Sequence, residues 1–162
     1  MDLNIRSFEE EDLEKVLELT IPAWRPIFSS FERLLGSKIY SVVFPDWKES
    51  QKETVEKFCT ERESANVLVA EIEGEVIGFL SYELKEEKKV GEIMLLAVDP
   101  EYQERGIGTK LNDTALQEMK EAGMKVAAVD TGGDESHAPA RRSYEKAGFS
   151  KTIPSVRYYK RL

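Results

Sequence analysis

One stretch limits the architecture of this 162-residue chain more than any other, residues 98–111, which read VDPEYQERGIGTKL. An apolar strand pattern ends at Val98, a turn with Pro100 follows, and Gly106 and Gly108 open a helical pattern. A helix that begins in this way points several backbone N–H groups without an intrahelical acceptor toward one spot, where the helix dipole favours an anion. Glycine also lets a ligand approach the backbone closely. The stretch therefore predicts a phosphate-binding turn between a strand and a helix.

Two common phosphate-binding motifs do not fit this stretch. The dinucleotide fingerprint needs a third glycine at position 111, and a P-loop that begins at Gly106 needs one there as well, but Leu111 occupies the position. A Gly-x-Gly pair alone is a weak signal, because a plain turn gives the same pattern. Its interpretation therefore depends on the rest of the chain.

The remaining sequence alternates between the helical and the strand period, and no linker or repeat divides it. A capping box of Ser7 and Glu10 is expected to begin the first helix. Helices are expected over about residues 7–17, 23–42, 46–61, 107–122 and 138–147. Strands are expected at 3–6, 66–72, 75–84, 89–98 and 125–130, with two short strands at the end. We expect a single domain over residues 1–162, of the α/β class, with a mixed, mostly antiparallel twisted sheet of about seven strands and helices on both faces.

Composition and charge exclude several classes of protein. With one histidine and one cysteine, the chain cannot build a Cys/His zinc site or an internal disulfide, so we expect no metal. No run of 18 apolar residues could span a membrane, and the acidic N-terminus does not resemble a signal peptide. We therefore expect a cytoplasmic protein. The net charge of −8 argues against a nucleic-acid partner.

The charge is distributed unevenly. Residues 1–82 hold 9 Lys and Arg against 17 Asp and Glu, whereas residues 83–162 hold 14 of each kind. The acidic half therefore carries the whole net charge.

Two motifs together resemble those of the GNAT superfamily of N-acetyltransferases. Residues 103–108, QERGIG, are similar to the family's acetyl-CoA loop, and residues 96–100, LAVDP, to the strand that leads into it. Residues 137–149, HAPARRSYEKAGF, resemble the family's second motif, and the two motifs stand in the family's order. The resemblance covers nearly the whole chain, is weakest over residues 20–65, and implies a GNAT-like fold with acetyl-CoA as co-substrate. It assigns cofactor contacts to Leu96, Ala97, Val98, Gln103, Glu104, Arg105, Gly106, Ile107, Gly108, Thr109, His137 and Ala140.

The resemblance also implies catalytic roles for two residues. Tyr144 matches the general acid that protonates the departing CoA sulfur, and the alternative is a core tyrosine. Glu92 lies on the strand where some members carry a general base, and strand alternation is expected to place it on one side with Met94, Leu96 and Val98. The alternatives are a glutamate that pairs with a lysine and an ordered water as the base. The backbone N–H of Leu96 would polarise the thioester carbonyl.

Several other positions leave two interpretations open. His137 stands where the family usually has asparagine, so it is either a cofactor contact or a surface residue at the helix entry. Arg141 and Arg142 either reach CoA phosphates or face water. The aromatic residues of the acceptor side are expected to be mostly core, with one or two in a pocket; they are Trp24, Phe28, Phe31, Tyr40, Phe44, Trp47 and Phe58.

The resemblance thus implies an enzyme that transfers acetyl from acetyl-CoA directly to a primary amine of a small molecule or peptide, a reaction that needs no metal and no enzyme nucleophile. A cationic acceptor fits the acidic half. The alternatives are a protein N-terminal or lysine acetyltransferase and a non-catalytic acyl-CoA-binding module. The oligomeric state stays open, with a homodimer as one option.

Overall fold

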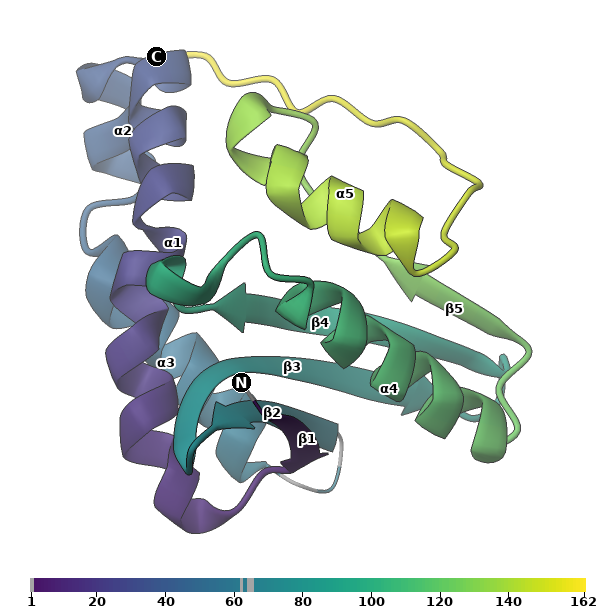
Figure 1. Ribbon diagram of the computed structural model, residues 1–162. Coiled ribbons are helices and arrows are strands. Elements are labelled where there is room, and N and C mark those ends of the chain that lie inside the picture. The colour runs from purple at the N-terminus through teal and green to yellow at the C-terminus, as the bar shows by residue number, and fades with distance from the viewer. Residues whose placement is uncertain (1, 62, 64–65) are drawn as a thin grey trace.

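A single mixed sheet organises the computed structural model, which describes residues 2–61, 63 and 66–162 (Figure 1). Within these residues five strands lie in the order β1 (Leu3–Ser7), β2 (Asn66–Ile72), β3 (Glu75–Lys85), β4 (Val90–Val98) and β5 (Val126–Val129). The first four strands pair antiparallel, and β5 pairs parallel with β4. The parallel pair needs a crossover, which α4 (Ile107–Glu121) supplies.

Helices cover both faces of the sheet, as the sequence predicts. On one face α1 (Leu13–Leu35) and α3 (Trp47–Thr60) pack Val16 and Val55 against Val69, Phe79 and Ala97. On the other face α4 packs against the alternate side chains of the same strands, and α5 (Ala138–Lys146) lies beside α4. The α4 face is built from Leu68, Leu80, Ile93, Leu111 and Met119, among others.

The remaining elements are short. The helix α2 (Ser37–Val43) follows α1, and 3-10 turns span Glu10–Asp12, Pro100–Tyr102 and Glu135–His137. Between β2 and β3, Glu73 and Gly74 both have positive φ, which is the geometry of a tight hairpin turn. The hairpin that the sequence predicts at this position is confirmed.

The expectation of about seven strands is wrong for the described residues. Residues 150–162, where the last two strands are expected, form no secondary structure and run along the outer side of α5 (Figure 1). A strand forms only where another strand pairs with it, and none of the described strands pairs with this segment. Its apolar side chains consequently stay in solvent, with Ile153 96% and Tyr158 90% exposed.

The beginning of the chain also differs from the prediction. The capping box is formed by Glu9 and Asp12 rather than by Ser7 and Glu10. The two helices expected around residue 20 are one, because α1 continues through Pro22 and Pro26. Proline interrupts backbone hydrogen bonding, so the packing of the apolar face of α1 against the sheet and α3 must outweigh that loss.

A β-bulge in β4 changes which side chains share a face. The register runs from Tyr82 opposite Ile93 to Ser81 opposite Leu95, so Met94 is an extra residue without a partner on β3. Ile93 and Leu96 consequently face α4 together. Glu92 lies on the opposite face from Leu96, and the expectation that the two share one side is wrong.

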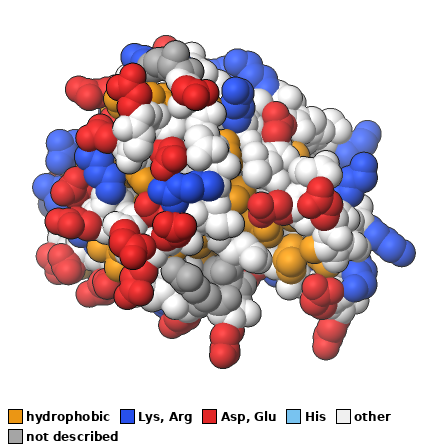
Figure 2. All heavy atoms as spheres, turned by 60° about the horizontal axis from the view of Figure 1, so that its bottom comes forward, with side chains coloured by type: hydrophobic (Ala, Val, Ile, Leu, Met, Phe, Trp, Pro, Cys, Tyr) orange, Lys and Arg blue, Asp and Glu red, His pale blue; other side chains and the backbone are white. Residues whose placement is uncertain are grey.

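Acidic side chains gather over the N-terminal helices. Figure 2 shows Asp and Glu crowding the part of the surface that lies over α1 and α3, with basic side chains among them. Among the described residues, no helix combines the length and apolarity that a membrane span requires. The same residues contain no group of three or more His, Cys, Asp or Glu side chains placed to hold a metal ion.

Candidate active site

One edge of the sheet is unpaired at the end of β4, where the sequence predicts a ligand-binding turn. Pairing between β4 and β5 ends at Ile93 and Val129, but β4 continues to Val98. Beyond Ile93, no described strand pairs with β4 on its β5 side, so backbone groups of residues 94–97 on that edge have no strand partner and are available to a ligand. Leu96, Ala97 and Val98 line a cavity at this edge.

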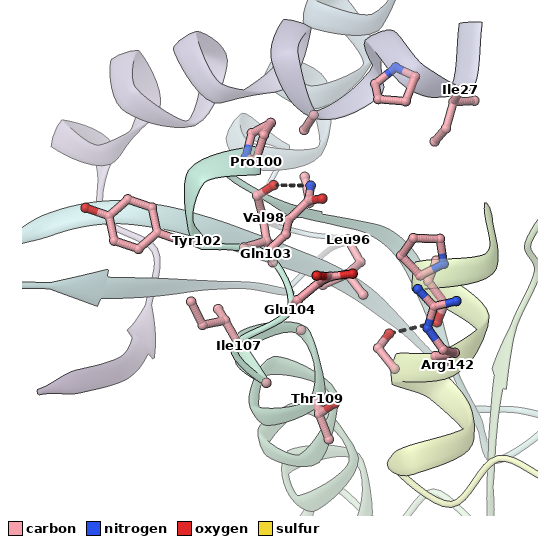
Figure 3. A pocket seen from close by; sticks show the side chains of 18 of the residues that line it. Ile27, Leu96, Val98, Pro100, Tyr102, Gln103, Glu104, Ile107, Thr109 and Arg142 are labelled. Atoms are coloured by element: carbon pink, nitrogen blue, oxygen red, sulfur yellow. Dashed lines mark hydrogen bonds between the residues drawn. The ribbon is translucent and has the colours of Figure 1, made fainter. Parts of the chain in front are cut away.

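The turn after β4 is held by local hydrogen bonds. The Asp99 N–H donates to the Ile77 carbonyl at 2.8 Å, and the Asp99 carboxylate accepts from the Glu101 N–H at 2.9 Å. The Gln103 side chain donates back to the Val98 carbonyl at 2.9 Å (Figure 3). Because its amide is occupied in this way, Gln103 braces the turn against the end of the strand.

Glycine opens α4 with the geometry that the sequence implies. Gly106 has φ of +77° at the N-cap, a conformation that favours glycine. The N–H groups of Ile107, Gly108 and Thr109 stand in the first turn of the helix and have no acceptor within it. All three residues line the cavity, so these groups are available to an anion there.

The cavity has a volume of about 560 Å³ and lies where α1, β4, α4 and α5 meet. Figure 3 shows Leu96 between Glu104 of the turn and Arg142 of α5, with Ile27 of α1 farther away. Helix α4 approaches α5 closely here, because a Cβ at Gly108 would lie 3.6 Å from the Ser143 Cβ.

The charges around the cavity have both signs. Arg142 and Lys146 line it from α5, and Glu104 lines it from the turn. All three side chains belong to exposed residues, so solvent screens them. The two cations and the helix N-terminus favour a negatively charged ligand, and Glu104 opposes it.

The structure brings together most of the cofactor contacts that the sequence predicts. All of them line the cavity except Arg105 and His137. The Arg105 guanidinium stands over the Tyr102 ring at 5.2 Å from its centroid. The His137 imidazole bonds Asp134 between α1 and α5. Of the two arginines left open, Arg142 lines the cavity, whereas Arg141 donates to the Gly132 and Asp134 carbonyls at 2.6 and 2.7 Å.

The two predicted catalytic residues do not line the cavity. Tyr144 is buried, with its ring against Phe149, and burial raises the pKa of Tyr144 to about 12. Glu92 forms an ion pair with Lys85, and no cavity residue lies on its part of β4. At about 3.3 Å per residue, Glu92 is roughly 13 Å along the strand from Leu96. Their roles stay predictions.

The sequence does not reveal the wall that α1 contributes. Ala23, Trp24, Pro26 and Ile27 line the cavity from this helix. Their spacing of three and four residues defines one helix face. The sequence predicts a helix that begins near residue 23, so this face was not identified as part of one long helix. The cavity also includes Pro100, Tyr102, Ser136, Pro139, Arg142, Ser143 and Lys146, none of which the motif assigns to the cofactor.

The aromatic residues of α1, α2 and α3 mostly pack against one another. Phe28 stacks on Trp47 with 4.4 Å between ring centroids and meets Phe44 edge-on at 5.4 Å. Trp24 lies against Phe79 of the sheet and also lines the cavity. The cluster thus stabilises the helices, and Trp24 is the aromatic residue of α1 that reaches the cavity.

Together, the fold and the cavity define a protein that binds an anionic ligand at a helix N-terminus beside an open strand edge. A sequence profile of the acetyltransferase (GNAT) family matches residues 21–149. The chain therefore belongs to the GNAT family of acetyltransferases.

Individual relatives agree with this assignment. An uncharacterized N-acetyltransferase of Archaeoglobus fulgidus is 31% identical over 150 residues, which cover 88% of this chain and 89% of the relative. The PaiA N-acetyltransferase of Thermoplasma acidophilum, solved in complex with coenzyme A, is 21% identical with a TM-score of 0.72 and covers 96% of this chain and 94% of that one. The aminoglycoside acetyltransferase AAC(6')-Iy, solved with a bisubstrate analogue of CoA, is 18% identical with a TM-score of 0.68, and both chains are covered fully.

Proposed function

We propose that the protein transfers the acetyl group of acetyl-CoA directly to a primary amine of a small molecule or peptide. The observation that carries the proposal is the cavity, which joins the free N–H groups of α4 to the open edge of β4. The PaiA structure with coenzyme A and the AAC(6')-Iy structure with a CoA analogue support it from the same fold.

The residues of the cavity fit the parts of acetyl-CoA. The first-turn N–H groups of α4, Arg142 and Lys146 suit the phosphates. The open edge of β4 suits the amide-containing arm, which can pair with it as a strand would. At this edge the Leu96 N–H is our candidate for polarising the acetyl carbonyl, and the bulge at Met94 sets the direction of the strand just before it.

Direct transfer needs proton movements but no enzyme nucleophile. Acetyl-CoA supplies an activated acyl group when bound. An amine acceptor is mostly protonated at neutral pH and must lose a proton before it can attack. Tyr144, next to the cavity residue Ser143, is our candidate for the acid that protonates the sulfur, and its raised pKa keeps its proton in place. Glu92 is the base that the family resemblance suggests, although its carboxylate forms an ion pair with Lys85.

The acceptor would enter against the α1 wall of the cavity. Ala23, Trp24 and Ile27 offer an apolar surface there, and they belong to the acidic half of the chain. A field of this sign attracts a cationic amine. A small molecule or peptide fits this side, and AAC(6')-Iy was solved with an analogue that contains acetylneamine.

Two measurements test the proposal. Calorimetric titration should show binding of acetyl-CoA, and release of free thiol should depend on an amine from a panel that includes aminoglycosides, polyamines and peptides. Arg142→Gln should weaken acetyl-CoA binding on the order of tenfold, because a charge-assisted hydrogen bond contributes about 1.5 kcal/mol. Lys151→Gln is the matched control, since Lys151 is exposed and does not line the cavity. A protein that does not bind acetyl-CoA would refute the proposal.

A further inference from the structure

A carboxylate between α1 and α5 collects three hydrogen bonds that the proposed reaction does not yet use. The Ser30 hydroxyl of α1 donates to Asp134 Oδ2 at 2.8 Å, and the Ser136 hydroxyl donates to the same oxygen. Asp134 Oδ1 bonds the His137 Nδ1. Burial raises the pKa of Asp134, but the hydrogen bonds from Ser136, Ser30 and His137 outweigh it and hold that pKa at about 2. Asp134 is therefore ionised at neutral pH.

The ionised carboxylate fixes the tautomer of the imidazole. A carboxylate only accepts hydrogen bonds, so the His137 Nδ1 carries a proton, and in the neutral ring Nε2 is the nitrogen with the lone pair. No described residue hydrogen-bonds Nε2. The ring is also held in place, because Phe31 of α1 stacks on it at 5.9 Å between centroids and a Cβ at Gly132 would overlap it. The imidazole is thus oriented as a general base would be.

The imidazole stands beside the cavity. Ser136, directly before it, and Pro139 and Ala140, directly after it, line the cavity. Ile27, which lies one helical turn before Phe31, lines it from α1. The His137 ring contacts Phe31 of α1 and directly precedes α5, so it lies where these two helices meet. Its side chain is 15% exposed and lies next to the residues that line the cavity rather than among them.

The cluster is not arranged as a nucleophilic triad. A serine nucleophile needs one imidazole nitrogen for itself while the acid binds the other. Here the Ser136 hydroxyl donates to Asp134, and its contact with the imidazole, 3.3 Å, is to the same Nδ1 that Asp134 binds. The arrangement leaves Nε2 for a proton that comes from elsewhere.

We propose that His137, oriented by Asp134, is the base that takes the proton of the acceptor amine, in place of Glu92. The inference rests on the proposed function. One ammonium proton passes to Nε2, directly or through one water. The neutral amine nitrogen then bonds the acetyl carbon while the carbon–sulfur bond breaks, and a second amine proton ends on the sulfur. The imidazolium returns its proton to solvent before the next turnover.

The surroundings of the imidazole agree with this role. Asp134 stabilises the imidazolium that forms, and it acts as a positioning residue because it works through His137. Arg141 of α5 donates to the Asp134 and Gly132 carbonyls and not to the carboxylate, so it holds the loop without neutralising Asp134. The contacts from α1, Ser30 and Phe31, are uncharged. Glu92, by comparison, is paired with Lys85.

The experiment measures the pH profile of kcat in His137→Asn. Asparagine can still donate to Asp134 but cannot accept a proton, so it separates the base role from the structural one. Wild-type kcat should depend on pH through one titratable group, because a base must be deprotonated to take the proton of the amine. His137→Asn should lose this titration and about 100-fold or more of kcat at pH 7, with acetyl-CoA affinity within about threefold of wild type.

Three further variants decide between the alternatives. Asp134→Asn should lower kcat at least about tenfold, because the imidazolium that forms loses its anionic partner. His137→Gln replaces His137→Asn if the latter does not give a cooperative thermal transition. Glu92→Gln should keep the titration. A titration that persists in the His137 variant, or one that disappears only in Glu92→Gln, overturns the role of His137. A wild-type protein without acetyl-CoA binding or amine-dependent thiol release refutes the proposed function itself.

Discussion

Replacing each of the two glycines at the start of α4 by alanine should change the free energy of unfolding in opposite directions. Gly106 has φ of +77° and no atom within 4 Å of the position of a Cβ, so Gly106→Ala adds backbone strain and no contact. A left-handed conformation costs a residue with a Cβ about 1–2 kcal/mol. Gly108 stands inside the helix, and its Cβ would meet Ser143 and Leu96 at 3.6–3.9 Å, which is ordinary contact. Gly108→Ala should therefore stabilise the protein by about 0.5–1 kcal/mol.

Thermal and urea denaturation measure this difference. The two variants should differ by roughly 1.5–3 kcal/mol in the free energy of unfolding, or about 3–12 °C in Tm for a protein of this size. Gly106→Asn is the control, because asparagine tolerates the left-handed region and should lose less than Gly106→Ala. A Gly106→Ala variant as stable as the wild type would show that the left-handed cap is wrong. A destabilised Gly108→Ala would show that α4 and α5 approach more closely than the structure indicates.

Three other substitutions test the charges and the buried hydroxyl. Glu104→Gln removes the carboxylate from the cavity and should tighten acetyl-CoA binding a few-fold, most clearly at low salt, in a calorimetric titration. Tyr144→Phe should slow thiol release with little change in acetyl-CoA affinity if Tyr144 is the acid, and an unchanged rate would exclude that role. Because the pKa of Tyr144 is raised to about 12 in the folded state, the stability it contributes is present below pH 10 and is lost between about pH 10 and 12. Tyr144→Phe should therefore reduce the slope of alkaline unfolding in that window. Glu92→Gln breaks the pair with Lys85, which is 45% exposed, and should change the unfolding free energy by less than about 1 kcal/mol in urea denaturation.

Local signals made the turn between β4 and α4 predictable. The strand end at Val98, the turn at Pro100 and the helix start at Gly106 are set by residues adjacent in the chain, and each has its own conformational preference. The hairpin at Gly74 was predictable for the same reason.

Features that depend on distant residues were not predictable. The bulge at Met94 is invisible because residues 93–98 are apolar without alternation, so the sequence does not show where the pleat changes phase. The continuity of α1 depends on packing against the sheet and α3, which outweighs the two prolines. The hydrogen bond from Ser30 to Asp134 joins residues 104 positions apart. The resemblance placed His137 near the cofactor, but its partners across the α1–α5 junction needed the structure.

The prediction of two strands at the end of the chain was wrong for a different reason. Residues 150–162 have strand-forming side chains, among them Val156, Tyr158 and Tyr159, and propensity alone favours an extended conformation. Propensity does not supply a partner edge, and this segment lies beside α5. Local preference alone therefore does not produce a strand here.

The extra residue in β4 lets this strand lose one residue without rearranging the site. Loss of Met94 would remove the residue that has no partner and restore regular pairing with β3. Glu92 and Leu96 would then be three residues apart and would stay on opposite faces, as they are now. A regularly paired strand has no such residue to lose, because a shift by one residue turns its side chains to the other face. The bulge thus makes the two faces of β4 tolerant of a deletion at this position, which a comparison of aligned residue types would not reveal.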